Sequence, residues 1–281
     1  MAGTLYLCAT PIGNLDDMTF RVLDTLRSVD VIAAEDTRNS IKLLNRFEIK
    51  TPMTSYHEYN KVEKAEKLIS MMQEGKNVAL ITDAGTPAIS DPGEVLVRMC
   101  HENGVPVTSL PGACACITAL TLSGLPTRRF CFEAFLPADK NERRDILEDL
   151  KEESRTIILY EAPHHLKGTL AELYECLGER KISLCRELTK KFETIMPTTL
   201  SEAIAFYEEN EPKGEYVLVL EGKSIQSRKD EEKKEWQQLS IGEHMAFYES
   251  RGMDHKEAMK KVAKDRGLSK RDVYQYLLEN S

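Results

Sequence analysis

Short apolar runs alternate with amphipathic stretches from residue 4 to residue 221. The apolar runs are rich in Val, Ile and Leu, and most end at Gly, Pro or small polar residues, as buried strands do. Most of these apolar runs are followed by a stretch in which apolar residues recur with helical spacing. Residues 61–74 are an example, and Gly75 ends that pattern. Strands that alternate with helices predict a mostly parallel sheet. The predicted strands are 4–9, 29–34, 78–81, 105–110, 130–135, 156–160, 182–187 and 215–221.

A second alternating unit begins near residue 124. The pattern therefore predicts an α/β fold with two α/β domains, over residues 1–120 and 121–223. Ser201 is expected to cap the last helix of this part, with Glu202 in its first turn. The predicted helices are 19–28, 39–47, 61–74, 94–103, 141–153, 166–177 and 201–210.

The character of the chain changes after residue 223. Residues 224–236 are a charge run with almost no large apolar residue before Trp236, typical of a linker or a solvated helix. Residues 237–281 have helical spacing, with Asp254 and Ser269 as expected caps. Two short helices joined by a glycine turn resemble a helix-turn-helix. The sequence thus predicts a small helical C-terminal region.

The chain of 281 residues is 41% hydrophobic and carries a net charge of -8. That charge argues against a globally basic nucleic-acid binder and leaves room for a local basic patch. Residues 255–271 hold seven Lys or Arg against two Asp or Glu. This segment either contacts phosphates or is simply a solvated pair of helices.

Seven cysteines occur without Cys-x-x-Cys spacing, so we expect neither a disulfide framework nor a metal site. Cys114 and Cys116 stand in an apolar run and are expected to be small packing residues. No window approaches 18 uninterrupted apolar residues, and the N-terminus lacks a signal-peptide pattern. We therefore expect no membrane association and a reducing, cytoplasmic location.

The loop predicted at residues 82–93 holds two glycines and two prolines. Such a segment cannot continue a strand or start an ordinary helix, so it is either a surface turn or a rigid loop whose backbone approaches a ligand. Loops 10–14 and 111–116 have a similar composition and follow strands of the same predicted sheet, at the edge where α/β proteins bind ligands. Neither a P-loop nor a Gly-x-Gly-x-x-Gly motif is present, and the expected pocket suits a neutral or zwitterionic cofactor.

The run at 83–93, Asp-Ala-Gly-Thr-Pro-Ala-Ile-Ser-Asp-Pro-Gly, resembles the signature of a bacterial ribosomal RNA methyltransferase family, the small-subunit methyltransferase I group. That group belongs to the larger tetrapyrrole methylase fold class. The resemblance covers residues 4–222, and the basic helical tail also fits the group. Further matching motifs occur in order at 9–15, 34–38, 55–60, 111–112, 160–164, 186–190 and 214–217.

The resemblance implies an S-adenosylmethionine-dependent enzyme that methylates the ribose 2′-hydroxyl of a cytidine in the decoding region of 16S rRNA. It also implies a homodimer, the small ribosomal subunit as the setting, and a cofactor in the cleft between two α/β domains. The resemblance places Glu161 and Leu188 near the cofactor less firmly, because members of the fold class differ at these two positions. The residues expected to line the cofactor are Pro11, Ala84, Gly85, Thr86, Ile89, Cys114 and Ala115.

Methyl transfer is an in-line displacement, so the protein mainly aligns the reacting atoms and excludes water. A ribose hydroxyl is a poor nucleophile, and a base or a cation beside the developing alkoxide would help. The catalytic candidates are Asp36, His57 and Lys190. Glu35 is a further base candidate and Arg38 a further cation candidate. The candidates for substrate contact are Glu35, Arg38, Asn60, Lys260 and Lys264.

Plainer roles remain open for these residues. Residues 35–38 could be a helix N-cap, His57 a solvated loop histidine and Lys190 a surface charge. Tyr56 and Tyr59 flank His57 and could stack on RNA bases.

Three departures from the family pattern stand out. Tyr59 occupies the place where a second histidine is expected, so a base there would be missing. Ala162 stands before Pro163 where serine is commoner. Thr82 for serine is a conservative change.

Two other functions compete with rRNA methylation. One is methylation of a tetrapyrrole or another small molecule, which the basic tail and the motif at 34–38 disfavour. The other is an RNA-binding assembly factor without catalysis, which the glycine and proline loops disfavour. Cofactor binding would separate the assembly factor from both enzymes.

Overall fold

The structure, a computed structural model, describes residues 2–224, 236 and 238–279. The chain forms two compact units, one of residues 1–150 and 155–221 and the other of residues 151–154 and 222–281. The divisions predicted at residues 120 and 237 remain predictions, and most of the predicted linker 224–236 lies outside the described residues. Within the described part of the chain, every helix is too short or too polar to cross a bilayer.

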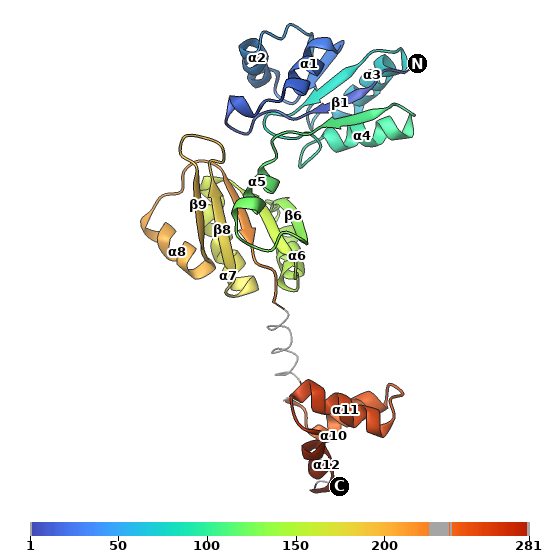
Figure 1. The fold of residues 1–281 in the computed structure, drawn as a ribbon, viewed down its shortest axis with the longest axis vertical. Helices are drawn as coiled ribbons and strands as arrows, with labels where there is room; N and C mark the ends of the chain where they lie inside the picture. The colour runs from blue at the N-terminus through green and yellow to red at the C-terminus, as the bar shows by residue number, and fades with distance from the viewer. Residues whose placement is uncertain (1, 225–235, 237, 280–281) are drawn as a thin grey trace. The chain divides into compact units, whose positions relative to one another are not determined.

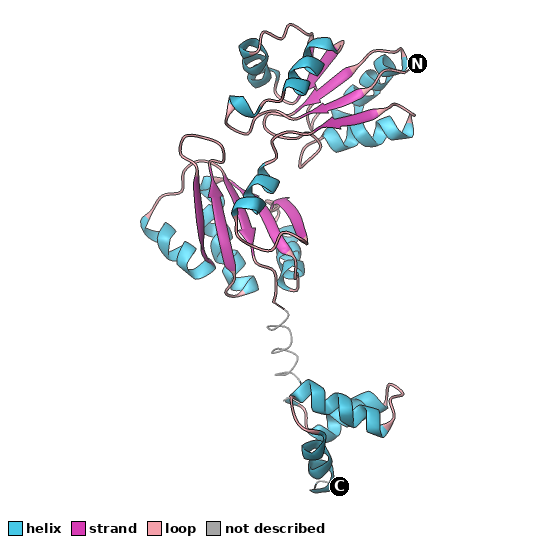
Figure 2. Ribbon diagram, in the orientation of Figure 1, coloured by secondary structure: helices cyan, strands magenta, loops and turns pink. Residues whose placement is uncertain are grey.

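The first sheet of the larger unit is entirely parallel, as the sequence predicts (Figures 1 and 2). Its strand order is β3-β2-β4-β1-β5, with ends at Leu5–Cys8 for β1, Val31–Ala34 for β2, Met53–Ser55 for β3, Val78–Ile81 for β4 and Val107–Leu110 for β5. The helices between them are η1 (Leu15–Asp17), α1 (Phe20–Ser28), α2 (Thr37–Arg46), α3 (Lys61–Gln73) and α4 (Gly93–Glu102).

Burial on both faces explains the apolar runs of this sheet. Alternate strand residues such as Leu80 and Ile81 enter two separate cores. One core contains α3 and α4 residues such as Leu68 and Leu96, and the other contains α1 and α2 residues such as Leu26. Helices on both faces leave the carboxyl ends of the strands free for ligand-binding loops.

The second sheet is mixed, so a mostly parallel arrangement is wrong for this half. Its order is β6-β7-β10-β8-β9, and only β6 and β7 run parallel. Strand β9 (Thr194–Thr199) was not predicted, because Pro197 interrupts the pattern of this edge strand. The other strands are β6 (Phe130–Phe135), β7 (Thr156–Glu161), β8 (Lys181–Arg186) and β10 (Tyr216–Leu220).

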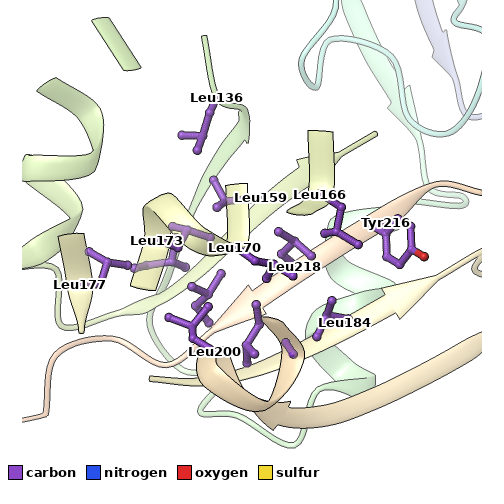
Figure 3. Packing of buried hydrophobic residues seen from close by; sticks show 14 of the residues in the cluster. Leu136, Leu159, Leu166, Leu170, Leu173, Leu177, Leu184, Leu200, Tyr216 and Leu218 are labelled. Atoms are coloured by element: carbon purple, nitrogen blue, oxygen red, sulfur yellow. The ribbon is translucent and has the colours of Figure 1, made fainter. Parts of the chain in front are cut away.

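Four helices accompany this sheet: α5 (Ala115–Leu122), α6 (Lys140–Lys151), α7 (Pro163–Leu177) and α8 (Leu200–Glu209). Leucines of α7 and β7 pack with Leu200 and Leu218 in one core (Figure 3). The predicted Ser201 cap is wrong, because Thr199 caps α8 in a capping box with Glu202.

The smaller unit contains α10 (Ile241–Glu249), α11 (His255–Arg266) and α12 (Lys270–Glu279) around its own apolar core. The predicted caps are confirmed: Asp254 accepts the Glu257 N–H at 2.8 Å, and Ser269 accepts the Asp272 N–H at 3.2 Å. Gly267 ends α11 in the left-handed conformation, which glycine adopts without strain.

Candidate functional site

The three predicted loops meet at the carboxyl edge of the first sheet. Thr10 and Gly85 form an antiparallel bridge, with N–H···O distances of 2.9 and 3.0 Å. The Thr10 hydroxyl also donates to the Thr82 carbonyl at 3.1 Å. The Thr86 hydroxyl donates to the Ala113 carbonyl at 2.9 Å. Hydrogen bonds therefore join the loops after β1, β4 and β5, as the sequence predicts.

Glycine is required at two of these positions. Gly85 has φ of +84°, and a Cβ there would lie 3.2 Å from Ile12 Cγ2. A Cβ on Gly112 would lie 2.5 Å from the Cβ of Ala9, closer than two carbons pack. Gly85 thus lies close to the side chain of Ile12, and Gly112 lies close to that of Ala9, at the edge where the loops meet.

Asp91 organises the loop after β4. Its Oδ1 accepts the Ala88 N–H at 3.0 Å and the Gly93 N–H at 2.7 Å. Ala88 and Ser90 have φ of +66° and +64°, a conformation that non-glycine residues adopt at a cost. Burial raises the pKa of Asp91, and its buried Oδ2 has no partner among the described residues. Strain together with an unpartnered buried acceptor indicates a ligand-binding loop.

A cavity of about 460 Å³ lies beside these loops, with walls from both sheets of the larger unit. Its size is typical of a small-molecule site. Glu161 and Leu188 also line it, whereas Ile12 lines it in place of its neighbour Pro11. Of the residues expected around the cofactor, it brings together Ala84, Gly85, Thr86, Ile89, Cys114 and Ala115.

Tyr160 forms an aromatic part of the wall and was not predicted as a site residue. Its hydroxyl accepts the Cys116 N–H at 3.2 Å, and its ring meets the edge of Phe135 at 5.6 Å. Burial raises the pKa of Tyr160, so the phenol stays protonated. The sequence signal that could have identified Tyr160 as a cavity residue was its place at the end of a buried strand, directly before Glu161.

A cluster of charged side chains forms another part of the cavity wall. Lys190 Nζ donates to Glu187 at 2.9 Å and to Glu215 at 2.8 Å, and all three residues line the cavity. Partial burial lowers the pKa of Lys190, but the bonds to the two carboxylates outweigh it and leave the pKa above its usual value. Lys190 therefore holds a positive charge at this wall.

The motif at 34–38 contributes one residue to the cavity. Glu35 lines it and accepts the Thr82 hydroxyl at 2.6 Å. Asp36 instead caps α2, accepting the Arg38 N–H at 2.8 Å and pairing with its guanidinium at 2.9 Å. The Arg38 side chain lowers the pKa of Asp36 to about 2, which makes this carboxylate a weak base.

His57 and Asn60 bind one another and do not line the cavity. The His57 N–H donates to Asn60 Oδ1 at 2.8 Å, and the Asn60 amide nitrogen lies 3.3 Å from His57 Nε2. Stacking of Tyr56 on RNA is wrong, since the ring is 1% exposed and its hydroxyl donates to the Pro92 carbonyl at 2.9 Å. Tyr59 is 97% exposed, so its predicted stacking stays a prediction.

Lys260 and Lys264 lie one turn apart on α11 of the smaller unit, and both are exposed. Two other basic residues of this segment have structural partners. Lys261 pairs with Asp265 at 3.0 Å, and Arg266 donates to the carbonyls of Leu239 and Ser240. The roles predicted for Lys260 and Lys264 in substrate contact stay predictions.

The two sheets and the loop-lined cavity define the fold of a known class of methylating enzymes. Residues 4–204 match the model of the Tetrapyrrole (Corrin/Porphyrin) Methylases, and the chain belongs to this family. The fold is also that of uroporphyrin-III-C-methyltransferase from Thermus thermophilus, with a TM-score of 0.55, 20% identity and coverage of 77% of this chain and 94% of that one. A diphthine synthase aligns with a TM-score of 0.63 and 14% identity over 79% and 91% of the two chains.

Within the family, three similar curated proteins carry the name Ribosomal RNA small subunit methyltransferase I. The protein of Bacillus subtilis (strain 168) is 50% identical over 97% of this chain and 93% of its own length. That of Synechocystis sp. (strain PCC 6803) is 46% identical over 99% and 98%. That of Escherichia coli O157:H7 is 50% identical over 80% and 79%. The resemblance found in the motifs is confirmed.

Proposed function

We propose that the protein transfers the methyl group of S-adenosylmethionine to the 2′-hydroxyl of a cytidine ribose in the decoding region of 16S rRNA. The observation that carries this proposal is the cavity, which the glycine loops of the family signature and the Lys190 cluster line together. The family and the shared name of the relatives supply the reaction class and ribosomal RNA as the class of substrate.

The loop part of the cavity fits a zwitterionic sulfonium cofactor. Gly85 lets the backbone approach closely, and the buried Asp91 carboxylate fixes the shape of the loop through the Ala88 and Gly93 N–H groups. Ala84, Ile89 and Ala115 add small or apolar surface. S-adenosylmethionine supplies the activated methyl group when bound there.

The charged part of the cavity fits the reacting hydroxyl. A ribose oxygen gains negative charge as it attacks, and a fixed ammonium lowers the cost of that charge. Lys190 keeps its proton, so it acts as the cation. Asp36 is too weak a base and instead positions Arg38, while His57 would have to approach the substrate from outside the cavity wall.

The small ribosomal subunit is the proposed setting of the reaction. A net charge of -8 repels RNA, so basic groups must supply local phosphate contacts. Lys260 and Lys264 are the proposed contacts in the smaller unit. Phosphate contacts position RNA without reading its sequence, so target choice would depend on the shape of the folded rRNA. A homodimer and a cytoplasmic location complete the proposal.

The test uses small subunits purified from cells that lack this protein, incubated with methyl-labelled S-adenosylmethionine. Naked 16S rRNA and a porphyrinogen run in parallel as alternative acceptors. We expect label in the subunit at one cytidine whose 3′ phosphodiester resists alkali, because a methylated 2′-oxygen cannot attack it. Label in the porphyrinogen alone would overturn the substrate, and label in no acceptor would overturn the proposed activity.

A further inference from the structure

Cys114 and Cys116 form a close pair of thiols at the cavity. Their Sγ atoms lie 3.4 Å apart, within van der Waals contact. Cys114 lines the cavity, whereas Cys116, in the first turn of α5, is 5% exposed and packs in an apolar core. Residues two apart in a chain are held at a Cα separation that a disulfide tolerates. To form a bond, the two sulfurs must approach from 3.4 Å to about 2.0 Å, which rotation of the two residues can supply.

The surroundings of Cys114 favour its thiolate. The Cys116 thiol lies within hydrogen-bonding distance of it, and backbone N–H groups of Ile117 and Cys116 at the start of α5 add to this effect. Together they lower the pKa of Cys114, whereas the Cys114 sulfur and burial raise that of Cys116. A low-pKa thiol that is accessible from a cavity and stands beside a second thiol is the arrangement of redox-sensitive cysteines.

Other cysteines of the chain lack this setting. Cys8, Cys100 and Cys185 are fully buried, and burial raises the pKa of each. Their thiols are therefore protonated and shielded from oxidants. Selective oxidation is expected at the Cys114–Cys116 pair.

We propose that a small peroxide oxidises Cys114 and Cys116 to a reversible disulfide, and that this disulfide weakens cofactor binding. The second clause rests on the proposed function, because it places the cofactor in this cavity. The consequence is an enzyme whose methyl transfer falls under oxidative stress and recovers when a dithiol reductant restores the pair. Transient, regulatory disulfides of this kind occur in reducing compartments.

The chemistry balances in two steps. The Cys114 thiolate attacks one peroxide oxygen, the O–O bond breaks, and the hydroxide released takes up a proton to become water. The Cys116 sulfur then attacks the resulting sulfenic acid, so the S–S bond forms as the S–O bond breaks. The second hydroxide leaves with the Cys116 proton as water. Two thiols lose two electrons, and one peroxide becomes two waters.

The disulfide would disturb contacts that shape the cavity. In the first turn of α5, the Cys114 carbonyl accepts two hydrogen bonds from Thr118, one from its N–H at 3.0 Å and one from its hydroxyl at 2.9 Å. The Cys116 N–H donates to the Tyr160 hydroxyl at 3.2 Å. Drawing the two sulfurs together must rotate these residues and move the wall formed by Cys114 and Ala115.

The first measurement is the intact mass of the full-length protein after mild hydrogen peroxide treatment, followed by peptide fragmentation. We expect the protein to lose the mass of two hydrogens. Fragmentation at the Leu110–Pro111 bond separates Cys100 from Cys114 and Cys116, and the mass loss should lie in the fragment that begins at Pro111. Cys116→Ser should lack this loss and instead give a sulfenic acid at Cys114 that dimedone traps. The control Cys131→Ser/Cys176→Ser changes two half-buried thiols outside the cavity and should behave as wild type.

The second measurement is calorimetric titration with S-adenosylhomocysteine. We expect the oxidised protein to bind at least about tenfold more weakly than the reduced protein, with recovery after dithiothreitol. Oxidised Cys116→Ser reports the effect of sulfenic acid alone. A pair that stays reduced under peroxide, or a disulfide that leaves affinity unchanged, would contradict the proposal. Failure of the reduced protein to bind would instead count against the proposed function, and the mass result would still stand on its own.

Discussion

The two parts of the cavity wall are built in different ways. The loop side, made by residues 10–14, 82–93 and 111–116, is held by backbone contacts such as the bridge between Thr10 and Gly85. The charged side consists of side chains, namely Glu187, Lys190 and Glu215, which hydrogen bonds join to one another. A backbone-built wall is rigid and suits a cofactor that every cycle uses. A wall of paired charges can respond to charge that develops in a reacting group.

This contrast implies a division of labour. Variants on the loop side should weaken cofactor binding, and variants on the charged side should slow the reaction while cofactor still binds. The predictions below test whether the two effects separate.

The largest effect is expected from Lys190→Met, which removes the cation from the charged side. We expect kcat for methyl transfer to fall by about 100-fold to 1,000-fold, as when one charge-stabilising donor is lost from an active site. Steady-state transfer to small subunits measures it. The control is Lys191→Met at the exposed neighbour, which should leave kcat unchanged. A similar loss in both variants would mean that Lys190 contributes only general charge.

The next effect is expected from Gly85→Val on the loop side. A β-branched residue is strained at φ of +84°, and its methyls would meet Ile12. We expect about 100-fold weaker binding of S-adenosylhomocysteine by calorimetry. Gly104→Val is the matched control, because Gly104 has φ of +66° but has no neighbour within 4 Å at the Cβ position. Both variants should lose stability, so equal binding by the two would contradict a role for Gly85 in cofactor binding.

A smaller effect is expected from Lys260→Gln/Lys264→Gln in the smaller unit. We expect the KM for small subunits to rise about tenfold. The slope of the logarithm of the binding constant against the logarithm of salt concentration should become shallower by about two phosphate contacts. S-adenosylhomocysteine affinity should not change. The control Lys140→Gln/Arg144→Gln removes two exposed charges one turn apart on α6. If the control raises KM equally, then net charge rather than the smaller unit governs RNA binding.

The smallest effect is expected from Asp36→Asn, because asparagine also caps helices well. The folded-state pKa of about 2 lies below the ordinary 3.8, so the carboxylate stabilises the fold above that ordinary value and loses this effect as the pH falls through about 2. Asp36 is thus ionised throughout the working range. We expect kcat within about threefold of wild type and a pH–rate profile of unchanged shape from about pH 5 to 9. If the variant lost the fall in rate that the wild type shows at low pH, Asp36 would be the catalytic base.

Local rules made the loop side predictable from sequence. Glycine and proline at 82–93 left few backbone conformations, and parallel strands bring their carboxyl ends to one edge. The α8 cap is also readable from sequence, because Thr199 stands three residues before Glu202 as a capping box requires, whereas Ser201 does not.

The charged side depends on contacts between distant parts of the chain. Glu187 meets the Glu215 backbone because β8 and β10 pair antiparallel, with Arg186 opposite Tyr216. That register follows from a mixed sheet that alternation alone does not reveal. Burial of Tyr56 was missed for a similar reason, because the short strand β3 before it was not predicted.

The most direct test of the division of labour is isotope trapping with Lys190→Met. Labelled S-adenosylmethionine is bound first, and small subunits are then added with excess unlabelled cofactor. The account predicts that Lys190→Met retains label on the protein as wild type does but passes almost none of it into RNA. Loss of label from the protein before RNA is added, or trapping in RNA at the wild-type level, would contradict it.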